Sequence, residues 1–418
     1  MGGYAVHPFS GIIVRYVARQ TNEGDVSTST PVDAAADELH VNLWEVGSRP
    51  FIDIGILISN RAEVNAIEVV LPWKLGAEAI MDLGTRLNSE KSIAAIFNEA
   101  VRYDGSADEP FASVSFLKDN DQQTKKSSTE QKTEFVLLRL NSTHFSVFPR
   151  LTGEGEMTIL RINLSDTALS GYASISSKIY LRFRIKNVPH AIYQATFCQP
   201  DRNILSSFIE TRIIDFRINV RRGIPDELLA GDSNTHFPKF KKIHFFLTIN
   251  RSQECIFEGQ NFVGCRSLMD EDVWNEYVRS NVNAPITTDG SVRNYLGYQW
   301  TKAIKGGGNE AGHVKDLVAL GRFSRTSSST SQIFRFIGLG LVFGMAGNGA
   351  WEIIKFKSGH FFGSWGGDDT NNVFLILLIL LIAILLIFSG NIFDWFRKKA
   401  LFQTLLKRTI NCLSGLLK

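Results

Sequence analysis

The segment Val373–Phe388, VFLILLILLIAILLIF, constrains this chain more than any other part of its sequence. It contains no polar side chain, and together with the residues up to Phe393 it comes to about twenty residues. A helix of about twenty apolar residues spans roughly 30 Å, which is the thickness of the hydrocarbon core of a bilayer. Because the segment is apolar around its whole circumference, it predicts a membrane-spanning helix rather than a helix buried in a soluble core.

A second apolar segment, Ile333–Ile354, lies shortly before it and contains Arg335, Glu352 and five glycines. The two segments together predict a two-span transmembrane hairpin over residues 333–393. The alternative for the first segment is a re-entrant or interfacial helix.

One face of this first span carries small and polar residues. Helical spacing places Gly340, Gly344, Gly347 and Trp351 on that face, with Asn348 at its edge. Glycines four residues apart let helix backbones approach closely, and polar groups in a bilayer point to a bundle interior or a water path. We therefore expect this face to pack around a pore in an oligomer, or else on the second span of the same chain.

The flanking residues predict the topology. Basic residues precede the first span and follow the second, which indicates by the positive-inside rule that both ends are cytoplasmic. The first residues do not resemble a signal peptide. The expected location is therefore the inner membrane, with several spans. Residues 321–332 are rich in Ser and Thr and predict a hinge, and residues 394–418 predict a basic amphipathic helix on the membrane surface or on the soluble part.

The remaining sequence predicts a β-rich, β-sandwich-like α+β part that lies in the cytosol. Isoleucines alternate with other residues through Pro50–Ser59, and similar short strands recur along the chain. Helices are expected within Gly76–Tyr103, Ser267–Val278 and Glu310–Leu320. A charged loop without apolar residues separates an N-terminal subdomain, residues 1–118, from a second subdomain, residues 133–320, which we expect to bind ligand.

The soluble part carries no motif of a known enzyme class. Phosphate-loop, nucleophile-elbow, zinc-protease and dinucleotide-binding patterns are absent from the sequence. The four cysteines form no CxxC pair, so the sequence predicts no zinc site and no cofactor. We therefore expect a protein that is not an enzyme, although catalytic residues far apart in sequence would not be visible in this way.

Two basic strands supply the candidate ligand-binding residues. On the first, Arg182, Arg184 and Lys186 alternate with apolar residues; on the second, Arg217 and Arg221 do so. A cationic sheet face of this kind suits phosphate groups. The alternative is an exposed face whose cations pair with carboxylates. With a net charge of only +3, a compact anionic ligand is easier to accommodate than duplex DNA.

This order of parts, a β-rich cytosolic domain, a Ser/Thr-rich hinge and a C-terminal two-span hairpin, resembles that of membrane effectors of bacterial antiphage systems. The effector of Hailong-type systems is one such protein. The resemblance implies a cytosolic sensor that binds a nucleotide signal, and membrane helices that then open. It assigns no functional residue.

The sequence therefore predicts an oligomeric inner-membrane effector, an ion channel or pore gated by an anionic nucleotide-type ligand, in antiviral defence. Its expected partners are the lipid bilayer, further copies of the same chain, an anionic small molecule or oligonucleotide, and a signalling protein. The alternatives are a membrane-tethered scaffold without enzymatic activity, and a membrane-anchored enzyme with an unrecognised site.

Overall fold

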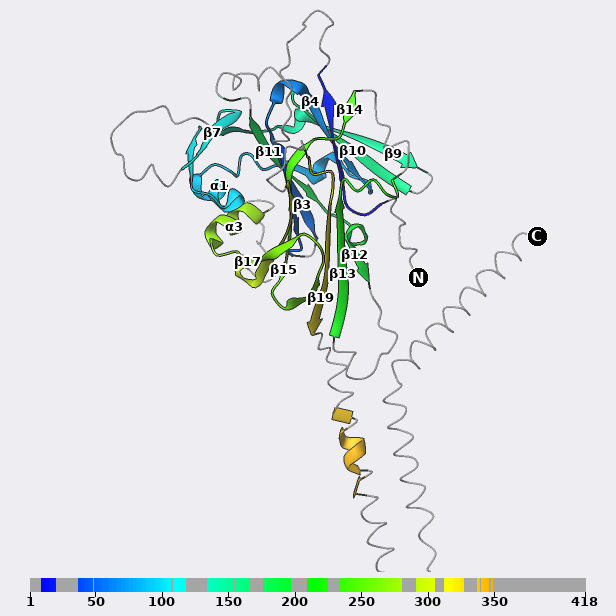
Figure 1. Cartoon of the computed structure of the whole chain (residues 1–418). Coiled ribbons are helices and arrows are strands. Elements are labelled where there is room, and N and C mark those ends of the chain that lie inside the picture. The colour runs from blue at the N-terminus through cyan, green and yellow to red at the C-terminus, as the bar shows by residue number, and fades with distance from the viewer. Residues whose placement is uncertain are drawn as a thin grey trace, which may run out of the picture. The chain divides into compact units, whose positions relative to one another are not determined.

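The structure is a computed structural model of the chain (Figure 1). It describes residues 9–19, 37–47, 49–106, 108–117, 134–152, 155–165, 176, 178–196, 209–224, 234–279, 291–304, 312–326, 337–338, 340–345 and 347–348. The chain divides into two compact units, residues 1–198 with 211–325, and residues 199–210 with 326–418. The first unit contains most of the described residues and is called the β-domain below.

The β-domain is built from three sheets. The largest, called the major sheet, has ten strands, and the other two have five and four. In spatial order the major sheet contains β17 (Phe262–Ser267), β18 (Tyr295–Ala303), β15 (Phe240–Asn250), β2 (Asp37–Trp44), β3 (Phe51–Ile58), β11 (Ile179–Lys186), β8 (Phe135–Leu138), β7 (Phe111–Phe116) and β6 (Val101–Asp104), with β5 (Ile80–Asp82) paired to β11.

The two smaller sheets complete the domain. The five-stranded sheet contains β14 (Thr235–His236), β1 (Ile13–Ala18), β4 (Val64–Leu71), β10 (Gly155–Asn163) and β9 (Phe145–Thr152). The four-stranded sheet contains β12 (Gln194–Thr196), β13 (Ile209–Ile218), β19 (Leu317–Thr326) and β16 (Gln253–Glu258). The described α-helices of the β-domain are α1 (Glu90–Phe97) and α3 (Glu271–Val278).

The major sheet is buried on both faces. Alternate residues of its central strands, such as Ile52, Ile54 and Ile56 of β3, belong to one hydrophobic core shared with both smaller sheets. We call this the inner face. Residues of the opposite parity, such as Trp44 and Phe51, belong to a second core together with α1 and α3, and we call this the outer face. Figure 1 shows α1 and α3 on one side of the domain and β9, β10 and β14 on the other.

Local sequence explains the two helices. Ser89 caps α1 through a hydrogen bond to the Ser92 amide, and Asn98 ends the helix in the left-handed conformation. The first turn of α3 carries Glu271 and Asp272, which favour a helix N-terminus. Both helices are short, so their stability must come from packing on the sheet.

A buried ion pair joins α3 to the major sheet. Arg184 Nε lies 2.6 Å from Asp53 Oδ1, and the two side chains are 1 % and 0 % exposed. Arg184 also donates to the carbonyl oxygens of Val278 and Tyr277, at 3.0 and 3.2 Å. These carbonyls lie in the last turn of α3, where no further helical amide can reach them. Arg184 thus provides hydrogen-bond donors for the last carbonyl groups of α3 and also neutralises the charge of the buried Asp53 carboxylate.

The structure corrects the expected fold class, which combined a β-rich part with an α-helical two-span transmembrane hairpin. Among the described residues, no helix is both long enough and apolar enough to cross a membrane. The described residues of the first expected span, 337–338, 340–345 and 347–348, are helical. The rest of the expected hairpin, residues 333–393, and the tail, residues 394–418, lie outside the described residues.

The expected subdomains and hinge are arranged differently from a simple series. Strands from both residues 1–118 and residues 133–320 pair within the major sheet and within the five-stranded sheet. Residues 321–326 of the expected hinge, residues 321–332, belong to β19, and its remaining residues lie outside the described part of the chain. Phe323 explains this strand, because its side chain is fully buried in the inner core.

We predict that Asp53→Asn lowers the free energy of unfolding by about 3–5 kcal/mol, because it leaves the charge of Arg184 buried without a counter-ion. Asp215→Asn is the matched control. Its partner Arg217 is 40 % exposed, so that variant should lose at most about 1 kcal/mol. Urea denaturation measures both, and equal losses in the two variants would contradict a dominant role for the buried pair.

Candidate functional site

A row of side chains crosses the outer face of the major sheet in register. Thr301, His244, His40, Gly55 and Arg182 are successive partners on β18, β15, β2, β3 and β11. Neighbouring strands lie about 4.8 Å apart, so side chains in such a row are in reach of one another. The row brings together residues from four distant parts of the sequence.

Gly55 makes room within this row for two larger side chains. A β-carbon at position 55 would lie 2.1 Å from the Tyr180 hydroxyl and 2.9 Å from Arg182 Nη1. Both neighbouring side chains are fully buried, so they have little space into which they could move. The absence of a side chain at Gly55 therefore sets the position of Arg182.

Arg182 is a buried cation that forms no ion pair with a carboxylate in the described part of the chain. Its Nε donates to the Tyr277 hydroxyl at 2.5 Å, and its Nη1 donates to the Tyr180 hydroxyl at 2.9 Å. Among the described residues, no hydrogen-bond acceptor contacts its Nη2, although that atom is buried. A buried guanidinium N–H group without a hydrogen-bond acceptor destabilises the folded protein, and a bound acceptor would remove that destabilisation.

Arg182 lines a cavity of about 470 Å³ on the outer face. Strands β2, β11, β15, β17 and β18 contribute to its lining together with α1 and the residues that follow it. The lining residues are Glu38, His40, Asn42, Ile96, Phe97, Asn98, Glu99, Phe116, Arg182, Lys242, His244, Phe246, Arg266 and Gln299.

The cavity combines cationic and aromatic groups. Its fixed charges are Arg182, Lys242 and Arg266 against the carboxylates Glu38 and Glu99, an excess of one positive charge. The guanidinium of Arg266 lies over the ring of Phe246, 5.1 Å from its centroid. Cations and ring faces in one cavity suit a ligand that has both an anionic group and a flat apolar part.

Two neutral imidazoles stand between these cations. Burial lowers the pKa of His40, and burial together with the positive charge of Lys242 lowers the pKa of His244 to about 3. His40 Nε2 lies 3.6 Å from Glu38 Oε2, and His244 Nδ1 lies 2.8 Å from the Thr301 hydroxyl. Both rings are therefore neutral at physiological pH and leave the cavity's charge to its arginines, its lysine and its carboxylates.

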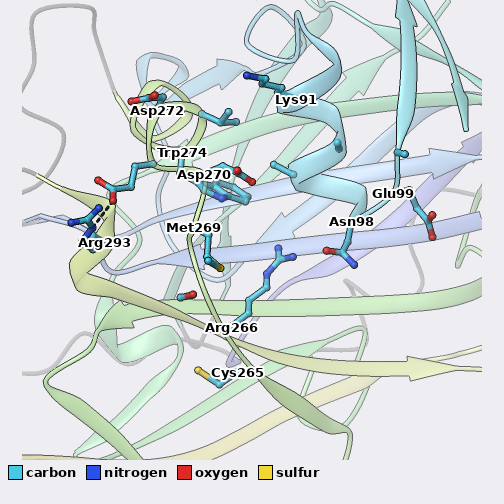
Figure 2. Close-up of a pocket in the computed structure, with 16 residues that line it drawn as sticks. Lys91, Asn98, Glu99, Cys265, Arg266, Met269, Asp270, Asp272, Trp274 and Arg293 are labelled. Carbon is cyan, nitrogen blue, oxygen red and sulfur yellow. Dashed lines mark hydrogen bonds and ion pairs between the residues drawn. The ribbon is translucent and has the colours of Figure 1, made fainter. Parts of the chain in front are cut away.

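A larger hollow of about 1240 Å³ adjoins the cavity between α1 and α3 (Figure 2). Asn98, Glu99 and Arg266 line both spaces. Figure 2 shows the side chain of Arg266 extending toward Asn98, with Met269 beside it. The hollow also contains the ion pair of Arg293 with Glu271. It forms a larger and more open hollow of mixed charge next to the cavity.

The residues expected on the first basic strand share one face of β11, but they have different surroundings. Arg182 lines the cavity, whereas Arg184 forms an ion pair with Asp53 and donates a hydrogen bond to the last turn of α3. Lys186 lies at the end of the strand, where partial burial and the charges of Arg184 and Arg86 lower its pKa. Only one of these three residues therefore lines the cavity.

The second basic strand lies in another sheet. On β13, Arg217 pairs with Asp215 at 2.7 Å. The guanidinium of Arg221, just beyond β13, lies 4.1 Å from the centroid of the Phe237 ring. Neither residue lines the cavity on the major sheet.

The residues expected to line a pore can be located only in part. Gly340, Gly344, Gly347 and Asn348 are helical, whereas Trp351 lies outside the described residues. A β-carbon placed on any of the three glycines would meet no other described atom within 4 Å.

Sequence reasoning missed most of the cavity, in particular Glu38, His40, Lys242 and His244. A signal was present in two strands, since Glu38-x-His40 and Lys242-x-His244 each place polar side chains on one face. The two segments lie about 200 residues apart, and their parallel pairing through β2 and β15 is a tertiary feature. The pattern could have identified a polar face on each strand, but it could not have shown that the two strands are neighbours in the sheet.

Known proteins provide no family assignment for this chain. No protein-family model matches the chain, and no curated protein matches its sequence.

We predict that Gly55→Ala lowers the free energy of unfolding by about 1–3 kcal/mol, because the new methyl group overlaps Tyr180 and Arg182. Gly264→Ala, in strand β17, is the control, since a β-carbon there meets nothing within 4 Å. Thermal and urea denaturation check the difference. A Gly55→Ala protein as stable as the control would show that the row is loosely packed.

Proposed function

We propose that the β-domain binds a compact anionic ligand of the nucleotide type in the cavity on the outer face, and that it acts as a sensor rather than as an enzyme. The observation that carries the proposal is the buried Nη2 of Arg182, which has no hydrogen-bond partner among the described residues and belongs to a side chain that lines the cavity. A phosphate oxygen is the acceptor that best matches a guanidinium.

The contrast with Arg184 supports this interpretation. The two arginines are two residues apart on β11 and are equally buried. Arg184 has a carboxylate and two helix carbonyls as partners, whereas Arg182 donates hydrogen bonds to two tyrosine hydroxyls and to no other described residue. A role in stabilising the fold explains all the contacts of Arg184, but it does not explain the unpartnered Nη2 donor of Arg182.

The remaining lining suits the base of a nucleotide. Phe97, Phe116 and Phe246 offer ring faces on which a base can stack. Asn42 and Gln299 offer both donors and acceptors for its polar edge. At about 470 Å³ the cavity falls within the range of small-molecule sites, about 300–1,000 Å³, and is too small for a duplex.

The lining favours binding over nucleophilic catalysis. Its described lining residues include no serine, threonine or cysteine. The polar groups are amides, cations, histidines and two carboxylates, which hold a ligand in one orientation through hydrogen bonds and charge.

The wider expectations stay predictions. These are the gated channel, the oligomer, the inner-membrane location, the role in antiviral defence, and the scaffold and enzyme alternatives. Ligand binding by the β-domain is the step that a gated effector would need first, because a ligand can shift a conformational equilibrium only through different affinities for the two states.

We predict that Lys242→Gln weakens binding of nucleotides by about 10–100-fold, because it removes a charge-assisted hydrogen bond from the cavity. Lys241→Gln is a matched control, since the neighbouring lysine is exposed and does not line the cavity. Isothermal titration of the full chain with adenosine and guanosine monophosphates and diphosphates, and with pyrophosphate, provides the affinities.

Both variants remove one positive charge, so long-range attraction changes equally in the two. Equal affinities of the two variants would assign any binding to general electrostatics and would contradict the cavity. Failure of every probe to bind the wild-type chain at millimolar concentration would contradict a compact nucleotide ligand.

We further predict that Arg182→Met abolishes this binding. Arg184→Met should destabilise the protein more than Arg182→Met does, and we expect the two free energies of unfolding to differ by at least about 2 kcal/mol. The reason is that Arg184→Met leaves Asp53 charged and buried, whereas Arg182→Met leaves no buried carboxylate unpaired. Urea denaturation of both variants measures the difference. Equal destabilisation would indicate that Arg182 has a structural role equivalent to that of Arg184.

A further inference from the structure

Three side chains in the wall of the cavity are arranged as metal ligands. Glu38 and His40 share one face of β2, and His244 lies opposite His40 on β15. One ligand atom from each lies within 4.8 Å of the others. Donor atoms around a tetrahedral zinc ion are about 3.4 Å apart, so small side-chain rotations bring the three into range.

Neighbouring groups orient both imidazoles. His244 Nδ1 lies 2.8 Å from the Thr301 hydroxyl, and among the described residues no hydrogen bond is made to its Nε2. His40 Nδ1 lies 3.5 Å from the Tyr180 hydroxyl, which leaves its Nε2 toward Glu38. Metal-binding histidines commonly engage the second ring nitrogen in this manner, which fixes the ring and directs the other nitrogen to the metal.

We propose that Glu38, His40 and His244 bind a divalent transition-metal ion of the zinc type, with its remaining coordination position open to the cavity. Two imidazoles and one carboxylate are a ligand set of zinc and non-haem iron sites, whereas calcium and magnesium require more oxygen ligands. Site geometry assigns the metal position independently of whether the cavity takes a nucleotide.

The charges nearby define what the open position would accept. Arg182 and Lys242 line the same cavity. They oppose a weakly held cation, so only a metal with strong nitrogen ligands would remain bound. They also favour an anionic oxygen in the open position, such as hydroxide or a phosphate oxygen.

The test is metal binding by the full chain, with purification tags removed and with no nucleotide present. We expect one Zn²⁺ per chain in competition with a chromophoric chelator, and a visible cobalt spectrum typical of four or five ligands on substitution with Co²⁺. His244→Gln and Glu38→Gln should each weaken Zn²⁺ binding by at least about 100-fold. His190→Gln, at an exposed histidine outside the cluster, should leave it unchanged within twofold.

Thr301→Val keeps the three ligands and removes the hydroxyl that contacts His244 and accepts a hydrogen bond from Gln299, so it should weaken binding by about 10-fold. Circular dichroism of each variant confirms that it folds. A wild-type chain that binds no stoichiometric Zn²⁺ at micromolar concentration would overturn the proposal. Unchanged affinity in folded His244→Gln would overturn it as well.

Discussion

The ion pair between Arg184 and Asp53 is the interaction on which the outer face of the β-domain depends. The major sheet is covered on both faces, so a carboxylate in the middle of β3 is stable only with a partner of opposite charge and good geometry. Arg184 supplies that partner and also binds the last carbonyls of α3. A single side chain thereby fixes the helix whose Tyr277 reaches Arg182.

The cavity follows from this arrangement. Tyr277 holds Arg182 Nε, Tyr180 holds Arg182 Nη1, and Gly55 leaves the space that both tyrosine and arginine require. The guanidinium is thus positioned before any ligand arrives, which reduces the entropy lost on binding. Its third nitrogen remains without a hydrogen-bond partner among the described residues, and the side chain that carries it lines the cavity.

Strand alternation explains which parts of the fold could be predicted from the sequence. The isoleucines of Pro50–Ser59 predicted β3, and the alternation of basic with apolar residues predicted that the two kinds lie on opposite faces of β11, where Leu181, Phe183 and Ile185 belong to the inner core. The expected helix over Glu310–Leu320 was wrong in its described residues, because Leu317–Leu320 begin strand β19, which lies between β13 and β16 in the four-stranded sheet. Local sequence propensity does not predict this strand, because tertiary packing determines which strands pair. Likewise, the sequence showed that Arg182 and Arg184 share a face, but not that α3 would cover it.

Anomalous X-ray diffraction from crystals of the full chain soaked in sodium selenate tests the central claim most directly, because selenate imitates phosphate and is located by its scattering. The account predicts a selenate ion inside the cavity, with an oxygen within hydrogen-bond distance of Arg182 Nη2 and with Lys242 or Arg266 nearby. Selenate bound only at exposed cations elsewhere, with the cavity filled by water, would contradict it.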